Sequence, residues 1–512
     1  MNEQKEYIIT VKDPADWDQV WDLFTQGGLG DNFIPPRPVD VINERPFNDY
    51  SAHFALTDSE AAELMKDPRF ASIELKASLQ EDVEKGFLGV RQGKFDKTNT
   101  IDNTMKNWGL LRSTNNSNPF ASSLSVTTDY NYNLDGTGVD IIVMDSGVMA
   151  NHPEFAVNAD GTGGSRVVDF DWSSLGVPGV PSAASIGGYL GDSDGHGSNC
   201  ASIAAGNTCG WAPGAAIYSI RIFDGGDTII NQYLGAIDSD LAFDLVKAFH
   251  LRKISQGNTR PTICTNSWGY RSSYSLMQYT VWRGTQYNNT SRNSAYGQVN
   301  GNHPYILNYV NVGADNAAAA GVIMVGAAGN YYHKIDILGG QDYDNYYRYN
   351  YFDLYYEDIY YHRGSSPTCA SSMITVGAID NTATEQKAVF SECGPGVDVY
   401  APGVMIMAAY ANSPYVTNAV PDPRNSTYHL NKISGTSMAC PQVTGMLACV
   451  LQARPSMTAT EAKNFITEHS VKNSLQVAGT ESYSNQRSIQ GGNNRILKTP
   501  FTSSIRGGIN TS

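Results

Sequence analysis

A series of short, mostly apolar runs separated by helical stretches sets the strongest limit on how this chain can fold. The runs are Val139–Met144, Ala216–Ile222, Thr262–Thr265, Gly321–Gly326, Met373–Val376 and Val397–Tyr400. Helical stretches are expected between several of them, over residues 233–254 and 315–320. Apolar strands that alternate with helices are typical of a parallel sheet covered on both faces. We therefore predict an α/β fold in which functional groups gather at the carboxyl edge of the strands.

Composition supports a large folded core and excludes some classes of partner. Of the 512 residues, 41% are hydrophobic and 17% are charged, which rules out disorder for the bulk of the chain. The formal net charge is −15, whereas nucleic-acid binding needs a basic surface. No stretch approaches the roughly 18 apolar residues of a membrane span. We expect neither nucleic acid nor membrane as a partner.

Changes of pattern along the chain divide it into four segments. Residues 5–80 show strand and helix patterns in the order β-α-β-α-β, which suits a small α+β sandwich. Residues 81–107 are polar and are expected to form an exposed linker. Residues 108–474 hold the apolar runs, and the polar residues 475–512 are expected to form a loosely packed tail. The predicted architecture is therefore a small N-terminal unit, a linker, a large α/β unit and a tail.

Cysteine usage and the N-terminus bear on the cellular compartment. The seven cysteines include no CxxC pair, so a disulfide framework and a zinc site are not expected. Most should be buried reduced thiols, with one or two bridges left open. Residues 1–6 carry charges of both signs and lead into only a short apolar run, Tyr7–Val11, unlike a cleavable export signal. Unless a leader precedes this sequence, a cytoplasmic or virion-associated location is favoured over secretion.

Three segments place a chemically reactive residue among small residues. Asp145 falls just past an apolar strand, where burying a carboxylate is otherwise costly. His196 lies between two glycines and before a helix of small residues. Ser437 opens an apolar helix, whose free N–H groups and dipole favour a developing anion, and Pro441 suits a first helical turn. Each has a structural alternative: an ordinary Asp after a strand, a hydrogen-bonded core histidine, or a serine that only caps its helix.

The order of these three residues along the chain distinguishes between classes of serine hydrolase. Asp…His…Ser differs from the orders of chymotrypsin and of the α/β-hydrolases, and Ala439 stands where a nucleophile elbow requires glycine. The segments Asp145-Ser-Gly, Gly-His196-Gly-Ser and Gly-Thr-Ser437-Met-Ala resemble the signatures of the subtilisin-like (subtilase) serine proteases. The resemblance covers about residues 5–470. It implies a three-layer α/β fold with a mostly parallel sheet, preceded by a small α+β propeptide domain.

The resemblance implies a catalytic role for each of these residues. Asp145 would orient His196, and His196 would take the proton of the Ser437 hydroxyl as it attacks a peptide carbonyl. Asn330, which ends an Ala-Ala-Gly-Asn segment after an apolar strand, would donate to the oxyanion together with the Ser437 backbone N–H. All polar parts of a working site are therefore expected.

Substrate binding, inhibition and cofactors follow from the same resemblance. Ser267, Trp268 and Gly269 would pair with extended substrate and form one wall of the S1 pocket, which receives the side chain on the acyl side of the scissile bond. Residues 5–80 resemble the family's inhibitory propeptide, with a processing site in the linker 81–107. No cofactor is required for the chemistry. Structural calcium is frequent in the family, but no acidic loop here identifies its ligands.

Two insertions depart from the family pattern. Residues 270–314 are rich in Tyr, Asn and Ser, and residues 331–366 hold 11 of the 30 tyrosines. The second insertion follows Asn330 directly. Its tyrosines would form either an aromatic rim on the S1 pocket or a surface hairpin that packs its own rings. Gln442 replaces the family's usual histidine, which affects packing, and Cys200 is expected to be a buried thiol.

The predicted function is that of a serine endopeptidase that hydrolyses peptide bonds in protein or peptide substrates. The enzyme would be made as an autoprocessed precursor, inhibited by its own N-terminal propeptide. Two alternatives stay open. One is a catalytically silent or occluded protein with a protease fold and a structural or binding role. The other is an acyl hydrolase of non-peptide esters, which the substrate-pairing segment disfavours.

Overall fold

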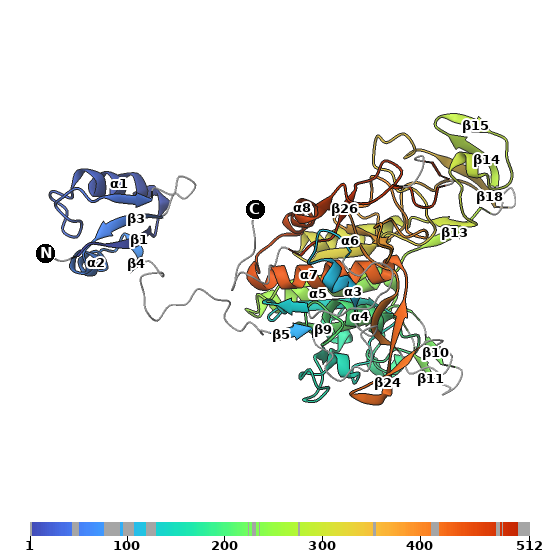
Figure 1. The fold of residues 1–512 in the computed structure, drawn as a ribbon, viewed down its shortest axis with the longest axis horizontal. Coiled ribbons are helices and arrows are strands. Elements are labelled where there is room, and N and C mark those ends of the chain that lie inside the picture. The colour runs from blue at the N-terminus through green and yellow to red at the C-terminus, as the bar shows by residue number, and fades with distance from the viewer. Residues whose placement is uncertain are drawn as a thin grey trace. The chain divides into compact units, whose positions relative to one another are not determined.

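The computed structural model describes most of the chain, which divides into two compact units. The described residues are 3–43, 51–75, 93–95, 107–118, 130–223, 225–227, 232–234, 236–274, 277–351, 355–410, 419–477, 482–483 and 485–499. The first unit runs over Met1–Leu88 and the second over Gly89–Ser512 (Figure 1).

The first unit is an antiparallel sheet of four strands, in the order β2-β3-β1-β4, with two helices. Its elements are β1 (Lys5–Val11), α1 (Trp17–Gln26), β2 (Val41–Asn43), β3 (Ser51–Leu56), α2 (Asp58–Leu64) and β4 (Phe70–Leu75). Thr57 and Glu60 form a capping box that satisfies backbone N–H groups where α2 begins. Phe24 stacks on Phe54 in the core, with ring centroids 4.5 Å apart. The short β2 is an addition to the expected strand and helix order.

A sheet of nine strands forms the centre of the second unit, in the order β25-β26-β21-β20-β17-β12-β7-β9-β8. Its strands are β7 (Asp140–Asp145), β8 (Val167–Val168), β9 (Ala216–Arg221), β12 (Thr262–Asn266), β17 (Ile323–Ala327), β20 (Ile374–Ile379), β21 (Val399–Pro402), β25 (Val471–Lys472) and β26 (Arg495–Ile496). All neighbours pair in parallel except β25 and β26. Every predicted apolar run forms a strand here, so the predicted α/β fold is confirmed.

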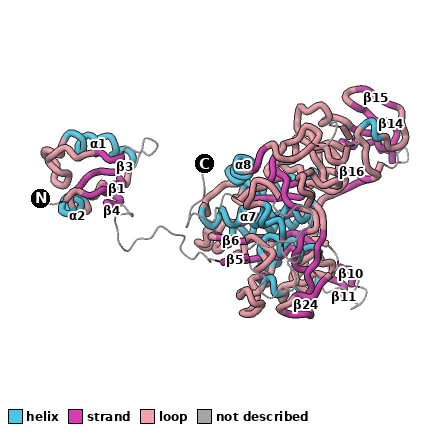
Figure 2. Tube along the Cα trace, viewed as in Figure 1, coloured by secondary structure: helices cyan, strands magenta, loops and turns pink. Residues whose placement is uncertain are grey.

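Helices cover both faces of this sheet (Figures 1 and 2). The main helices are α4 (His196–Ala205), α5 (Ser239–Ser255), α6 (Asn308–Ala319) and α7 (Thr436–Ala453), with α3 (Trp108–Arg112) and α8 (Ala459–His469) beside them. Ile142 and Met144 of β7 pack in one cluster with α5 and α6. Because side chains alternate along a strand, Asp145 points to the opposite face, where α4 and α7 lie.

Two of these helices differ in extent from the prediction. Helix α5 begins at Ser239 and not at residue 233, because residue 233 belongs to β11 (Gln232–Leu234), which pairs with β10 (Gly225–Asp227). Helix α6 begins at Asn308, seven residues before the expected start at 315. The sheet and its order are unaffected by either difference.

Helices α4 and α7 cross at close range because small residues line their contact. A Cβ atom on Gly445 of α7 would lie 2.4 Å from the carbonyl oxygen of Ala204 in α4. Only glycine therefore allows the two backbones to approach this closely. The crossing brings the N-terminal ends of both helices to the carboxyl end of β7.

The two insertions join in a single lobe. Their strands are β13 (Arg271–Ser273), β14 (Met277–Trp282), β15 (Thr285–Tyr287), β16 (Asn302–Pro304), β18 (Tyr346–Tyr351) and β19 (Tyr355–Tyr360). Strand β14 of the first insertion pairs with β18 of the second, in the order β15-β14-β18-β19. Tyr274, Tyr347 and Tyr361 are buried together beneath this sheet. We call residues 271–304 and 331–363 the aromatic lobe, and its buried tyrosines pack against one another, as the hairpin hypothesis expects.

The end of the chain departs from the expected loose tail. Strand β26 pairs with β21 of the central sheet, and Ile489, Ile496 and Leu497 are buried. A three-stranded sheet of β22 (Ile406–Tyr410), β23 (Val420–Asp422) and β24 (Asn425–Ile433) precedes α7. The linker 81–107 lies outside the described residues except for residue 107 and β5 (Gly93–Phe95), which pairs with β6 (Tyr130–Tyr132). Residues 485–499 are thus part of the folded unit.

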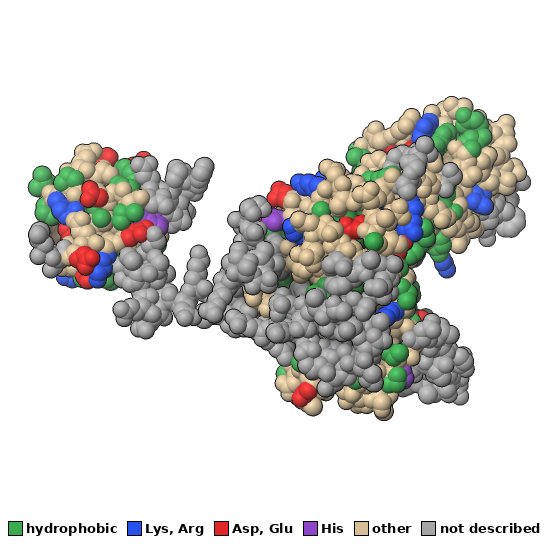
Figure 3. All heavy atoms as spheres, viewed as in Figure 1, with side chains coloured by type: hydrophobic (Ala, Val, Ile, Leu, Met, Phe, Trp, Pro, Cys, Tyr) green, Lys and Arg blue, Asp and Glu red, His purple; other side chains and the backbone are tan. Residues whose placement is uncertain are grey.

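The cysteine side chains are reduced thiols, and the surface carries charges of both signs. All seven cysteines are free, and all are buried except the half-buried Cys369. Among the residues coloured in Figure 3, acidic and basic side chains are interspersed on the displayed face. Within the described ranges, no helix combines the length and apolar character that crossing a membrane requires.

Candidate active site

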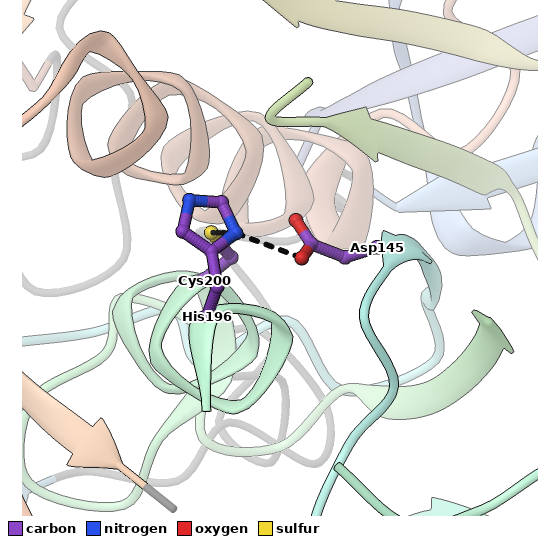
Figure 4. A group of neighbouring side chains, drawn as sticks. All are labelled: Asp145, His196 and Cys200. Atoms are coloured by element: carbon purple, nitrogen blue, oxygen red, sulfur yellow. Dashed lines mark hydrogen bonds and ion pairs between the residues drawn. The ribbon is translucent and has the colours of Figure 1, made fainter. Parts of the chain in front are cut away.

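Asp145 is the last residue of β7, and its carboxylate is 1% exposed. Its Oδ1 accepts hydrogen bonds from His196 Nδ1 at 2.8 Å and from the Ser146 backbone N–H at 2.7 Å (Figure 4). These charge-assisted bonds offset the cost of burying a carboxylate at this place. Asp145 is therefore held in a fixed orientation toward His196.

His196 begins α4, and a second buried carboxylate shapes the loop before it. Asp192 accepts hydrogen bonds from the backbone N–H groups of Gly195 and Ser198, each at 2.8 Å, and from the Ser146 hydroxyl at 2.9 Å. Burial raises the pKa of Asp192. The imidazole of His196 is 30% exposed, which does not fit a fully satisfied core histidine. Asp192 thus acts as a positioning residue that sequence analysis did not single out, although it is an acidic residue in the glycine-rich turn before His196.

The electrostatics of this pair favour a charged imidazole. Burial disfavours the imidazolium, but the neighbouring Asp145 carboxylate outweighs it and raises the pKa of His196 well above its usual value. Burial also raises the pKa of the Cys200 thiol, so this neighbour stays neutral near pH 7. A proton accepted by His196 is therefore stabilised by Asp145.

Ser437 is the second residue of α7, and Gly435 occupies the N-cap position. Ser437 therefore does not cap its helix, and that structural alternative is wrong. Its hydroxyl donates to the carbonyl oxygen of Ser267 at 3.1 Å. No hydrogen bond between Ser437 and His196 occurs among the described residues, so a rotation about χ1 of Ser437 is needed before proton transfer.

Pro441 explains how the backbone at Ser437 is held. Pro441 lies in the second turn of α7 and not in the first, as the sequence suggested. Since proline has no N–H, the carbonyl four residues earlier, that of Ser437, loses its helical donor. That oxygen instead accepts from Ser267 Oγ at 3.0 Å and Cys200 Sγ at 3.4 Å. The start of α7 is thereby tied to α4 and to the segment after β12.

Asn330 follows the end of β17 and has its side-chain amide oriented by Thr436. Its Oδ1 accepts from the Thr436 backbone N–H and from the Thr436 hydroxyl, both at 2.9 Å. The Thr436 hydroxyl in turn accepts from the Gly329 backbone N–H at 3.1 Å. The Nδ2 group lies on the side of Gly435, where a Cβ atom would be 3.6 Å from Nδ2 and 3.5 Å from the Ser437 backbone nitrogen. Because Nδ2 has no hydrogen-bond partner in the described part of the chain, it can donate to a negatively charged oxygen.

A single cleft of about 700 Å³ brings the predicted site residues together. Its lining includes Asp145, His196, Ser437, Asn330, Ser267, Trp268 and Gly269. The indole of Trp268 packs inward beside Phe243, with ring centroids 6.2 Å apart. Gly269 is exposed, and a Cβ atom there would lie 2.7 Å from Ser365 Oγ. Sequence analysis missed Ser365 and Glu392, which also line the cleft, because nothing local marks two residues far along the chain as its neighbours.

Asp145, His196 and Cys200 form the group of three metal-type ligand residues found within the described residues (Figure 4). Calcium takes six to eight oxygen ligands, whereas this group offers one carboxylate, one nitrogen and one sulfur. The Cys200 sulfur also lies 3.9 Å from His196 Nδ1, as a neutral thiol. The group does not fit a calcium site.

Comparisons with known proteins identify the family to which the chain belongs. A family model described as "Subtilase family" matches residues 136–491. An extracellular serine proteinase of Thermus sp. (strain Rt41A) is 26% identical over 445 residues, covering 87% of this chain and 74% of the relative. A subtilisin-like serine protease of Cochliobolus lunatus is 26% identical over 434 residues, covering 84% of this chain and 63% of the relative.

A solved structure of a cold-adapted subtilisin-like serine proteinase covers 78% of this chain and 100% of its own, with a TM-score of 0.48 and 20% identity. The expected cytoplasmic or virion-associated location is contradicted by the relatives, because the Thermus protein is named an extracellular proteinase. The family match spans well over half of the 512 residues. The chain therefore belongs to the subtilase family of subtilisin-like serine proteases.

Proposed function

We propose that Asp145, His196 and Ser437 are the catalytic triad with which this subtilase hydrolyses peptide bonds. The observation that carries the proposal is the 2.8 Å bond from His196 Nδ1 to Asp145 Oδ1, at the edge where α4 and α7 begin. Ser437 lines the same cleft. This is the arrangement of an acid, a base and a nucleophile that acyl transfer needs.

The acylation step follows from these contacts. After rotation, the Ser437 hydroxyl attacks the substrate carbonyl carbon and passes its proton to His196 Nε2. The imidazolium so formed is stabilised by Asp145, in line with the raised pKa of His196. His196 then gives the proton to the leaving amine as the C–N bond breaks. Water repeats the sequence on the acyl-enzyme and releases the acid.

The negative charge on the oxygen of the tetrahedral intermediate would be stabilised by two hydrogen-bond donors. One is Nδ2 of Asn330, whose orientation Thr436 fixes. The other is the backbone N–H of Ser437, at the N-terminal end of α7, where helical N–H groups lack internal partners. Donors that are already oriented need no reorganisation when the charge develops.

Extended protein or peptide substrates would lie along residues 267–269. Trp268 packs its ring inward, which leaves the backbone of this segment facing the cleft. Gly269 is exposed beside it. Backbone pairing of this kind favours peptides over simple esters, and the comparisons, in which the relatives are named proteinases, do not favour a catalytically silent protein.

Labelling with a fluorophosphonate tests the triad directly. The wild-type protein should be labelled on the peptide that contains Ser437, and Ser437→Ala should not react. Ser255→Ala removes an exposed hydroxyl that bonds only within α5, and serves as the matched control that keeps full labelling. A wild-type protein that stays unlabelled, or a Ser437→Ala protein that cleaves peptides normally, would reject the assignment.

We further propose that residues 5–80 act as an intramolecular propeptide, released by cleavage within residues 77–107. Support comes from the separate folding of Met1–Leu88 as a compact unit. N-terminal sequencing of purified wild-type and Ser437→Ala proteins tests this. The wild type should begin within that interval, and Ser437→Ala should keep its original N-terminus. Equal processing of both proteins would contradict autoprocessing.

The chemistry proposed uses no cofactor, since every step is carried by side chains or backbone N–H groups of this chain. Structural calcium, if bound, would act on stability. EDTA should therefore leave the initial rate of peptide cleavage unchanged at moderate temperature. An immediate loss of activity that calcium restores would show that the cleft itself depends on a metal.

A further inference from the structure

Glu392 is a buried acidic residue that lines the same cleft as Ser437 but plays no part in the triad. It is 2% exposed. Its backbone N–H donates to the carbonyl oxygen of Gly329 at 2.9 Å. Glu392 is thereby attached to the wall that ends in Asn330, the proposed oxyanion donor.

The Glu392 carboxyl group lacks a partner. Its Oε2 is buried without a hydrogen bond in the described part of the chain. The positive charge of Lys387 interacts electrostatically with the Glu392 carboxyl group. Lys387 Nζ, however, donates its hydrogen bonds to the carbonyl oxygens of Ala388 at 2.9 Å and Ser391 at 2.7 Å. Burial raises the pKa of Glu392 well above its usual value, and Lys387 opposes this only in part. A buried carboxyl with no donor is costly unless a ligand supplies one.

Two walls set where a ligand would meet this group. Gly329 has a φ of +123°, and a Cβ atom there would lie 2.4 Å from Glu392 Oε1. Glycine at this position thus lets the carboxyl lie directly against the wall. On the other wall, Ser365 Oγ lies against Gly269. A side chain that enters between Gly329 and Gly269 would therefore face Glu392 and Ser365.

We propose that Glu392 makes the S1 pocket selective for a cationic side chain, so that the enzyme cleaves after Lys or Arg. This inference rests on the triad proposed above, because Ser437 and Asn330 define which substrate residue enters between these walls. An ammonium or guanidinium group supplies both the charge and the N–H donors that the buried carboxyl lacks. An acidic side chain would be repelled, and an apolar one would leave the carboxyl without a partner.

Arg271 is the cation at the rim of the cleft, and it is engaged elsewhere. Its guanidinium lies over the Tyr331 ring, 5.7 Å from the centroid, and contacts the Tyr331 hydroxyl. Arg271 is exposed, whereas Glu392 is deeply buried. The counter-ion of Glu392 is thus left for the substrate to supply.

Peptides that differ only in the acyl-side residue test the proposal. The series uses Arg, Lys, Gln, Leu and Glu, and kcat/KM is expressed per active site titrated with a fluorophosphonate. In the wild type, Arg and Lys should exceed Leu by about 10²-fold, and Glu should be the poorest. In Glu392→Gln the Arg-to-Leu ratio should fall to about one, because the charge that favours Arg is gone. Asp344→Asn removes the same charge from a carboxylate that is 80% exposed, and should leave the ratio unchanged.

The pH dependence of the Arg-to-Leu ratio isolates Glu392. Titration of His196 affects both substrates and cancels in the ratio. As Glu392 loses its proton the ratio should rise with pH, and in Glu392→Gln it should stay flat. Lys387, whose pKa burial lowers to about 8, Tyr274, which also interacts electrostatically with Glu392, and Arg271 are all still present in that variant. A ratio that still changed with pH in Glu392→Gln would therefore be due to one of these groups and would contradict the assignment to Glu392.

Three results would overturn the proposal. The first is a labelled wild type that cleaves after Leu as well as after Arg. The second is a Glu392→Gln protein that keeps the wild-type Arg-to-Leu ratio. Either result would leave the triad intact. Absence of fluorophosphonate labelling in the wild type would instead reject the proposed function together with this inference.

Discussion

The edge of the central sheet and the aromatic lobe use buried polar side chains in different ways. At the sheet edge, the polar groups stand at the ends of β7, β12 and β17 and at the starts of α4 and α7, and several keep a free donor or acceptor. In the lobe, His303 and Tyr347 bond to each other at 2.9 Å, and Tyr347 also donates to the Ser273 carbonyl oxygen at 3.0 Å. The lobe also has unmet atoms among the described residues, such as Tyr274 Oη, His333 Nδ1 and His362 Nε2, but these three residues do not line the cleft. The two regions therefore differ in where their unmet groups face.

This difference teaches that burial alone does not identify a functional group. Asp342 in the lobe is buried as deeply as Asp145, but it is paired with Arg283 and Lys334. Those ion pairs and a bond from Tyr483 lower the pKa of Asp342, against the effect of burial. Among the described residues, Glu392 has no ion pair of this kind, and its Oε2 has no hydrogen-bond partner. An unmet hydrogen-bonding group in a cleft is the better indicator of function.

The largest effect should come from Asp145→Asn, which removes the charge that stabilises protonated His196. We expect kcat to fall by about 10⁴-fold, because the imidazole loses its orientation and counter-ion. With its pKa no longer raised by Asp145, His196 should also lose its proton at lower pH. The acid limb of the residual kcat/KM profile should therefore shift to lower pH. Steady-state kinetics across pH measure both. An unchanged acid limb would show that another group sets it.

The same substitution made in both regions should have opposite consequences. Asn330→Leu removes the proposed oxyanion donor and should lower kcat by about 10²–10³-fold with little change in KM. Asn345→Leu, in the lobe, removes bonds to the Arg283 backbone N–H and to Asp342 Oδ1. It should lower thermal stability and leave kcat per active site unchanged. If Asn345→Leu instead reduced kcat as strongly, the two regions would not be functionally separate.

Acid should loosen the lobe before it affects the sheet. Burial lowers the pKa of His303 and of His362 to about 4, compared with about 6.5 in an unfolded chain. Between pH 6.5 and 4 the unfolded lobe therefore binds protons that the folded lobe does not, and its stability falls as pH falls. Amide hydrogen exchange on Ser437→Ala protein, at pH 7 and pH 4.5 and corrected for the intrinsic exchange rate at each pH, should show lower protection factors in β14 and β18 at the lower pH. Equal protection factors at both pH values would contradict this.

Tyr347→Phe should show how much one buried hydroxyl contributes to the stability of the lobe. The change leaves His303 and the Ser273 carbonyl without this partner, which should cost about 1–3 kcal/mol of stability. Denaturant unfolding measures the loss, and peptide cleavage should be unaffected. His303→Asn provides a companion variant at the other end of the same bond, and a non-additive double variant would confirm that the two residues act as a pair.

The smallest effect is expected for Arg348→Gln on the lobe surface. Arg348 pairs across the strands with Asp358, and both side chains are about 30% exposed. Such partly exposed ion pairs contribute about 0–1 kcal/mol, so the unfolding midpoint should shift slightly and kcat not at all. A large shift at low salt that persists at high salt would show that this pair is more than a surface contact.

Much of the sheet edge could be predicted because its features are local. The apolar run that ends at Asp145, the glycines around His196 and the helix after Ser437 each occupy a short stretch whose pattern reports its own secondary structure. Parallel strands then bring their carboxyl ends to one edge, whatever the length of the connections. Family resemblance added Asn330 and the 267–269 segment.

The remaining features depend on contacts between distant segments. Pairing of β14 with β18 joins two insertions, β26 joins the central sheet from the C-terminus, and Pro441 redirects the Ser437 carbonyl to Ser267 and Cys200. None of these has a pattern within its own stretch, because strand partners and hydrogen-bond acceptors are chosen by the free energy of the whole fold.

By itself, the amino-acid sequence determined the α/β class, the strands and the three reactive residues, since periodicity and neighbouring glycines act over a few residues. Only the tertiary structure decided that Glu392 faces the cleft, that Tyr274, Tyr347 and Tyr361 are buried in the lobe, and that the Ser437 carbonyl oxygen is held by Ser267 and Cys200. The physical reason is that a side chain's surroundings, and with them its charge and its unmet hydrogen bonds, are set by segments far from it along the chain.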